Sequence, residues 1–135
     1  MSRWILPVFA IALGAPLLAP APTPATDTVS LLGTWSGHRE RIARVEGWRD
    51  GMVSLVVTEQ QGATFTAEIV LATPEGDDRQ PLWGALTPDG NLVAGADEEG
   101  VYSFSLVDPD TLDYCYVEAG AAARAVCARL ERQPD

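Results

Sequence analysis

Residues Tyr114 to Cys127, YCYVEAGAAARAVC, contain both cysteines of this 135-residue chain. Two strand-like runs flank a turn of small residues, so the stretch predicts a hairpin in which Cys115 faces Cys127. Directly opposed Cα atoms in an antiparallel ladder lie roughly 4.5–5.5 Å apart, which is within reach of a disulfide. The bond would close a loop of about a dozen residues and stabilise the fold by roughly 3 kcal/mol.

The register that this pairing imposes can be checked against the neighbouring residues. It opposes apolar to apolar residues in three pairs, Leu112–Leu130, Tyr114–Ala128 and Tyr116–Val126, and acid to base in three more, Asp113–Arg129, Glu118–Arg124 and Asp110–Arg132. Opposite charges across a ladder stabilise it modestly, whereas a slip by one residue would mix the two faces. We therefore predict a structural disulfide. A redox or metal-binding pair is the alternative, but C-x-x-C spacing is missing and the single histidine, His38, is far away in the sequence.

The same alternation of apolar and polar residues extends upstream, and turn residues interrupt it at short intervals. No segment after residue 30 keeps a helical period for three turns. The predicted strands are residues 32–43, 52–60, 64–72, 80–87, 91–96, 101–107, 112–118 and 123–132. Eight consecutive short strands predict an all-β fold, an eight-stranded antiparallel up-and-down barrel, because closure removes the exposed edges.

The N-terminus has the plan of a secretory signal peptide. Arg3 precedes an uncharged apolar run from Trp4 to Ala19, and small residues follow. The run contains two prolines and is short for a membrane span, which needs roughly 20 residues. Cleavage after Ala25 is preferred. We therefore predict a periplasmic or secreted protein, with an uncleaved N-terminal anchor as the alternative, and four segments: signal peptide 1–25, linker 26–30, barrel 31–132 and tail 133–135.

The charge of the chain excludes some classes of partner. The formal net charge is −10, with 19 acidic residues, and all nine cationic residues are arginines. A strongly acidic protein repels phosphate backbones and anionic lipid surfaces. We expect no nucleic-acid partner and, after signal cleavage, no membrane partner. A small apolar molecule or a protein remains as the expected partner, and the oligomeric state stays open.

Sequence signatures of catalysis are missing. The chain has no G-x-S-x-G nucleophile elbow and no phosphate-binding loop. His38 stands among charged residues and is interpreted as solvent-facing. Asp108, Asp110 and Asp113 offer oxygen ligands for calcium, but each also has a role as turn former or cross-strand partner. We expect a protein that is not an enzyme, with no catalytic residues, no cofactor and no metal site, and we leave calcium open.

Residues at the two ends of the barrel region carry a family resemblance. Gly33-Thr34-Trp35 opens the first strand and Arg132 closes the last, which resembles the calycin plan of lipocalins and avidins. The segments 82–90, 100–102 and 108–116 look like small secreted bacterial lipocalin-like proteins, mostly of unassigned function. The resemblance implies that Trp35 closes one end of the barrel, beside Gly33, and that Arg132 or Arg129 packs over it. The lipocalin T-D-Y segment and the biotin-binding signature of avidins are both missing.

Large aromatic residues supply the candidate ligand-lining set. An aromatic lining is typical of small-molecule pockets and equally of a filled core, so both interpretations remain. The candidates are Trp83, Tyr102, Phe104, Tyr114 and Tyr116. The sequence thus predicts an exported lipocalin-like barrel that binds a small apolar or amphipathic molecule, or a partner, at its open mouth. The alternatives are a protease inhibitor that uses the segment Thr26 to Ser30, a structural envelope protein with a filled core and, last, a small hydrolase.

Overall fold

The computed structural model describes residues 19–21, 27–90 and 92–135. The predicted signal peptide, residues 1–25, therefore lies almost entirely outside the described residues. No helix in the described part of the chain is long and apolar enough to cross a membrane.

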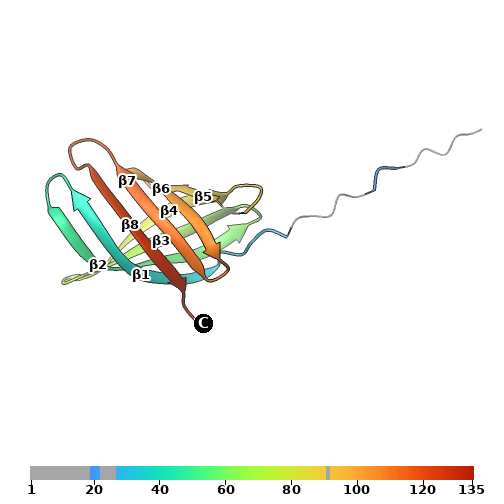
Figure 1. Cartoon of the computed structure of the whole chain (residues 1–135), viewed down its shortest axis with the longest axis horizontal. Coiled ribbons are helices and arrows are strands. Elements are labelled where there is room, and N and C mark those ends of the chain that lie inside the picture. The colour runs from blue at the N-terminus through green and yellow to red at the C-terminus, as the bar shows by residue number, and fades with distance from the viewer. Residues whose placement is uncertain (1–18, 22–26, 91) are drawn as a thin grey trace, which may run out of the picture.

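Eight antiparallel strands form a closed barrel, in which each strand pairs with its sequence neighbour and β8 pairs with β1 (Figure 1). The predicted all-β up-and-down barrel is confirmed. The strands are β1 (Gly33–Ala43), β2 (Gly47–Gln61), β3 (Thr64–Thr73), β4 (Gly76–Leu86), β5 (Leu92–Ala96), β6 (Gly100–Asp108), β7 (Thr111–Glu118) and β8 (Arg124–Arg132).

Two strands are longer than the sequence pattern predicts. β2 begins at Gly47 and β4 at Gly76, several residues before their apolar alternation starts. In the β1–β2 and β3–β4 hairpins, backbone hydrogen bonds continue through these polar residues. Such bonds form between main-chain groups and do not require apolar side chains. One consequence is that Trp48 lies near a hairpin tip and is 78% exposed.

One end of the barrel is closed by a packed core. The side chains there are almost completely buried, and the largest are Trp35, Phe104, Leu31, Leu55, Leu82, Leu112 and Leu130. The indole Nε1 of Trp35 donates a hydrogen bond to the carbonyl of Leu31 (2.9 Å). The guanidinium of Arg132 lies 4.0 Å from the centre of the Trp35 ring, and its N–H groups donate to the carbonyls of Leu32 and Ser30. Gly33 adjoins this contact with a φ of 110°.

The last hairpin has the predicted register. Cys115 opposes Cys127 and the two form a disulfide on the outer face, since the alternate residues Tyr114 and Val126 are buried inside. Asp113 accepts two hydrogen bonds from Arg129 (2.7 and 2.8 Å). The predicted disulfide is therefore confirmed.

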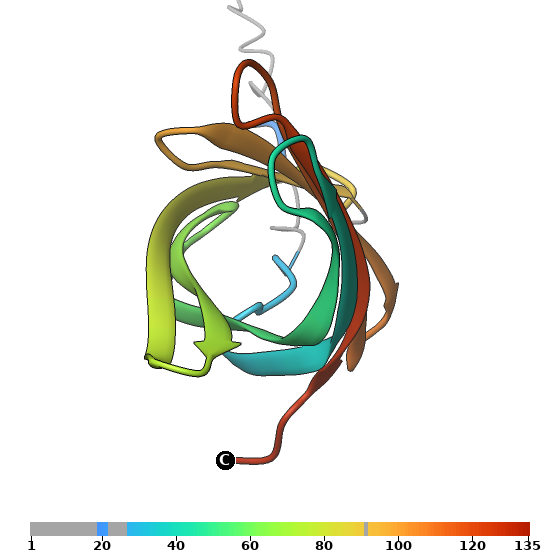
Figure 2. The ribbon, with the colours of Figure 1, turned by 90° about the vertical axis from the view of Figure 1, so that its left-hand side faces the viewer.

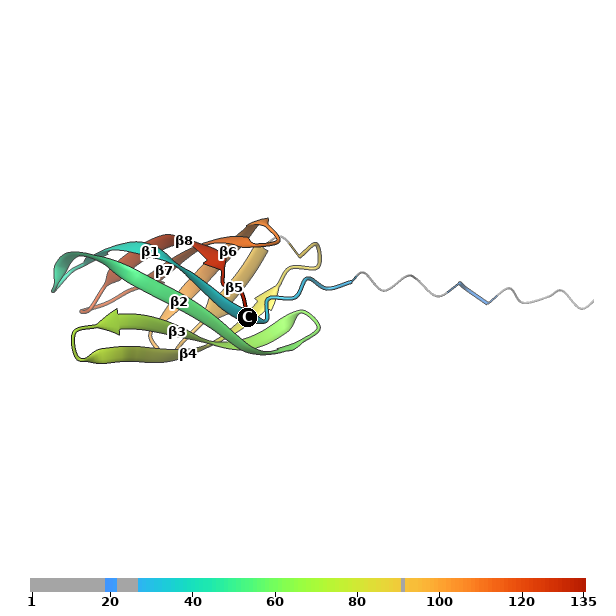
Figure 3. The ribbon, with the colours of Figure 1, turned by 90° about the horizontal axis from the view of Figure 1, so that it is seen from below.

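The other end of the barrel is its mouth. The β1–β2 and β3–β4 turns lie there, opposite the end at which the chain enters from residues 27–32 (Figure 3). Figure 2 looks into the barrel from the mouth and shows the strands surrounding the interior. The packed core begins at the far end and continues along the interior to Tyr116 and Val126, and the inward-facing residues near these turns decide what the mouth can accept.

Candidate functional site

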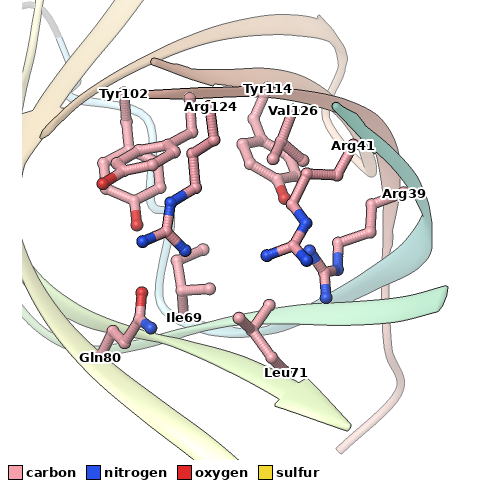
Figure 4. Close-up of a pocket in the computed structure, with 10 residues that line it drawn as sticks. Arg39, Arg41, Ile69, Leu71, Gln80, Tyr102, Tyr114, Arg124 and Val126 are labelled. Atoms are coloured by element: carbon pink, nitrogen blue, oxygen red, sulfur yellow. The ribbon is translucent and has the colours of Figure 1, made fainter. Parts of the chain in front are cut away.

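Three arginine side chains project into the barrel near the mouth (Figure 4). Arg39 and Arg41 lie four and six residues after Trp35 on β1. Alternate residues of a strand share one face of the sheet. Because Trp35 faces the core, both arginines must also face inward. In the β1–β8 register Ala43 opposes Arg124, which brings the third arginine to the same level.

The arginines share their pocket with tyrosines, a glutamine and aliphatic residues. Its lining consists of Arg39, Arg41, Ile69, Leu71, Gln80, Tyr102, Tyr114, Tyr116, Arg124 and Val126. The cavity between these side chains has a volume of about 30 Å³, which is room for a water molecule or a small ion. Small-molecule sites span roughly 300–1,000 Å³, so the cavity itself is about tenfold below that range.

The tyrosine wall offers one hydroxyl group without a protein partner. Tyr102 donates to Asp97 (3.0 Å) and Tyr116 donates to Glu118 (3.2 Å). The hydroxyl of Tyr114 forms no hydrogen bond within the described residues and points into the pocket toward the arginines (Figure 4). Burial raises the pKa of Tyr114 to about 12, so this hydroxyl stays protonated and can donate at neutral pH.

The pKa values of Tyr102 and Tyr116 are also raised, first by burial and next by the negative charge of Asp97. All three tyrosines of the chain therefore line one pocket and keep their protons near neutral pH.

The three arginines differ in their ion pairs. Arg41 pairs with Glu46. The Nε of Arg124 lies 2.7 Å from Glu118, close enough for an ion pair although the N–H direction does not meet hydrogen-bond geometry. Arg39 has no ion pair and no hydrogen bond from its side chain within the described residues.

Arg39 is also the most deeply placed of the three, with only 9% of its surface exposed and its Nε fully buried. Burial lowers the pKa of Arg39; Tyr114 and Glu46 oppose this shift, whereas the positive charges of Arg41 and Arg124 add to it. The pocket thus holds a guanidinium that no carboxylate contacts directly, which is an unfavourable arrangement in the absence of a bound anion.

The wall of the barrel is incomplete beside this pocket. β5 pairs with β4 only from Trp83 to Leu86, so the mouth half of β4 has no neighbour on that side. A surface hollow lined by Gln80, Pro81 and residues 97–99 occupies the gap. Gln80 borders both this hollow and the arginine pocket, so the pocket adjoins a side opening as well as the mouth.

The five aromatic candidates from the sequence separate into three locations. Tyr102, Tyr114 and Tyr116 line the pocket, whereas Phe104 is 1% exposed and belongs to the packed core. Trp83 differs from the expectation, because it lies on the outer face and is 54% exposed. Its neighbour Leu82 points into the core, and successive residues of a strand point to opposite faces.

The arginine pocket itself was not expected from the sequence. The available signal was the spacing of Arg39 and Arg41 from Trp35, an even number of residues that keeps all three on one face. The pairing of Arg124 with Glu118 was predicted, and the ion pair is present. The predicted pairing did not indicate that the side chains of Arg124 and Glu118 lie on the inner face of the barrel.

The remaining polar candidates lie elsewhere. The side chain of His38 is 55% exposed, with its Nε2 3.4 Å from Asp50. Asp108 accepts the N–H of Asp110 (2.9 Å), while Asp110 and Asp113 form ion pairs with Arg132 and Arg129. Within the ranges that the structure describes, no group of three or more His, Cys, Asp or Glu residues is arranged to hold a metal ion.

No protein-family model and no curated protein matches the chain. Three solved structures share its fold. A redesigned β-barrel aligns over 77% of this chain and 92% of its own length, with 10% identity and a TM-score of 0.53. The structure of EF1p2_mFAP2b bound to DFHBI aligns over 76% and 94%, with 14% identity and a TM-score of 0.54.

The third structure is a protein of unknown function from the DUF3598 family of Nostoc punctiforme. It aligns over 76% of this chain at 15% identity, with a TM-score of 0.57. The aligned region is only 47% of that protein, so it corresponds to about half of the larger chain. At these identities the likeness establishes the barrel fold alone.

Proposed function

We propose that this protein is an exported, lipocalin-like barrel that binds one small molecule in the pocket at its mouth. The observation that carries the proposal is the pocket itself, where a donor-rich set of arginine and tyrosine side chains faces aliphatic residues around a small cavity. Buried polar groups in folded proteins are normally hydrogen-bonded, and groups that lack a protein partner are candidates for binding a ligand or water.

Two further observations support parts of this proposal. The disulfide between Cys115 and Cys127 is typical of proteins that fold in oxidising compartments, which favours export. EF1p2_mFAP2b, a barrel of similar fold, is bound to DFHBI, so a barrel of this kind can bind a ligand.

The protease-inhibitor alternative gains no support. Residues 29 and 30, the end of the segment considered for protease inhibition, are held at the closed end: Gln60 donates to the carbonyl of Val29 (2.8 Å) and Arg132 to that of Ser30 (3.0 Å). A filled core describes most of the interior, because the core cluster continues into the pocket wall at Ile69, Tyr102, Tyr114, Tyr116 and Val126. The arginine side chains distinguish the pocket from that core.

Native mass spectrometry of the protein purified from its own host tests the proposal. We expect a reproducible extra mass of a small molecule that is lost on unfolding, on a polypeptide whose mass corresponds to cleavage after Ala25. The matched control is the same preparation after denaturation and refolding, which should be free of the adduct. A bare mass from the host, together with no binding of added small molecules, would contradict the binding function.

A further inference from the structure

We infer that the ligand carries an anionic group, a carboxylate or another small oxyanion, which binds Arg39 with help from Tyr114. This inference rests on the proposed binding function and specifies the chemical class of its ligand. Its grounds are the absence of an ion pair at Arg39 in the described part of the chain and the hydrogen-bond donors beside it.

Arg39 has no carboxylate in direct contact. Arg41 pairs with Glu46, and Arg124 pairs with Glu118 and, at 3.8 Å, with Glu99, but no carboxylate in the described part of the chain forms an ion pair with Arg39. A buried charge without a partner is costly, and a bound anion would remove that cost. The arrangement therefore selects for one anionic group rather than for a neutral or cationic one.

The free donors converge on the place where this group would bind. The Nε atoms of Arg39 and Arg41 are buried without hydrogen-bond partners. The Tyr114 hydroxyl points toward the same guanidinium groups (Figure 4). Arginine presents several N–H donors in a plane that matches the two oxygens of a carboxylate or the edge of a phosphate or sulfate.

The negative charge of the whole protein does not prevent this binding. Exposed charges are screened over about 8 Å at physiological ionic strength, whereas charges inside a partly buried pocket are screened much less. An anion at Arg39 would experience mainly the adjacent guanidinium groups. The acidic surface should slow the approach of anions without cancelling the local attraction.

The space in the pocket suits the anionic group alone. The cavity has a volume of about 30 Å³, which is room for a water molecule or a small oxyanion group. Any larger part of the ligand would have to extend out of the cavity, toward the mouth or toward the side opening beside Gln80.

Calorimetric titrations of the full-length mature protein with octanoate, octanol and octylamine test the inference. The three probes share one hydrocarbon chain, which can extend out of the mouth, and differ only in the head group. We expect octanoate to bind at least tenfold more tightly than octanol and octylamine, because only octanoate offers an anion to Arg39. Arg39→Met should weaken octanoate binding at least tenfold, and Tyr114→Phe should weaken it severalfold.

The matched control is Arg129→Met, which makes the same substitution on the outer face of the barrel and should leave octanoate binding unchanged. Equal binding of octanoate and octanol, or unchanged binding by Arg39→Met, would overturn the anion inference and leave the binding barrel intact. A neutral or cationic adduct on the protein from the host would likewise overturn the anion inference and leave the binding function intact. Failure of every probe together with a bare native mass would overturn the proposed function as well.

Discussion

Arg39 and Arg41 project from the same face of β1 into the barrel, but only Arg41 has a carboxylate partner, Glu46. Arg39 is the more buried of the two and lies beside two other guanidinium groups. An arginine in such a place reduces the stability of the empty protein, since burying an unpaired charge is unfavourable. Residues that reduce stability in this way are frequently found at functional sites.

The first prediction is that Arg39→Met stabilises the ligand-free protein. Methionine retains most of the buried volume and removes the unpaired charge, so we expect the free energy of unfolding to rise by about 1 kcal/mol or more. Urea denaturation followed by circular dichroism measures the change. Arg41→Met is the matched control and should not stabilise, because it leaves Glu46 without its partner. A loss of more than about 1 kcal/mol for Arg39→Met would show that Arg39 already has adequate polar partners in the empty protein.

The closing hairpin could be predicted from the sequence almost completely. Three opposite-charge pairs and three apolar pairs are compatible with only one register, and the cysteines fit that register. The inward face of β3, which carries Phe65, Ala67 and Ile69, follows from strict alternation for the same reason. The alternation of apolar and polar residues was sufficient to predict the buried face of a strand wherever apolar residues occupied that face.

The pocket was not predicted because its residues do not follow that rule. Arginine is rarely buried, so Arg39 and Arg41 in a charged run indicate a solvent-exposed surface when composition alone is considered. Only the position of Trp35 at the closed end assigns their face. The short pairing of β5 with β4, which creates the side opening near Gln80, is a tertiary feature without a sequence signature.

The second prediction concerns the closed end of the barrel. Arg132 lies over the Trp35 ring and donates to the carbonyls of Leu32, Ser30 and Pro109. A lysine keeps the charge but cannot reproduce several planar donors, so Arg132→Lys should lower the free energy of unfolding by about 2 kcal/mol. Chemical denaturation monitored by tryptophan fluorescence measures this.

Arg129→Lys is the control for that prediction. Arg129 pairs with Asp113 on the outer face, and its side chain is 62% exposed. Exposed ion pairs contribute about 0–1 kcal/mol, so the control should be nearly neutral. Equal effects of the two substitutions would mean that Arg132 acts only as a surface charge.

The third prediction tests the close approach of β1 and β8. A Cβ added at Gly37 would stand 2.0 Å from the backbone carbonyl oxygen of Arg129 and 3.1 Å from a methyl group of Leu130. The obstructing atom belongs to the backbone and cannot rotate away, so Gly37→Ala should cost about 1–3 kcal/mol. His38→Ala, at the next and exposed position, should change stability by no more than about 0.5 kcal/mol. Thermal unfolding of both variants measures these changes in stability. An unchanged stability of Gly37→Ala would show that β1 and β8 can move apart at little cost.

The fourth prediction is a loss of stability at alkaline pH that originates in the pocket. Burial raises the pKa of Tyr114 to about 12, whereas an unfolded tyrosine ionises near pH 10. Between these values the unfolded chain has lost the proton that the native state keeps, so stability falls as pH rises through this window. The contribution of Tyr114 should be fully present below pH 10, and about 2–3 kcal/mol of it should be lost by pH 12.

Urea denaturation of the native protein and of Tyr114→Phe, at pH 8 and at steps up to pH 12, measures this loss. The variant should lose less stability over the same range, because phenylalanine has no proton to release. Tyr102 and Tyr116 also have raised pKa values, so the chain has no tyrosine expected to ionise near pH 10 while it is folded. Tyrosinate absorbance should therefore appear only as the protein unfolds. An absorbance rise near pH 10 in a protein that remains folded would place at least one of these hydroxyl groups in contact with bulk water.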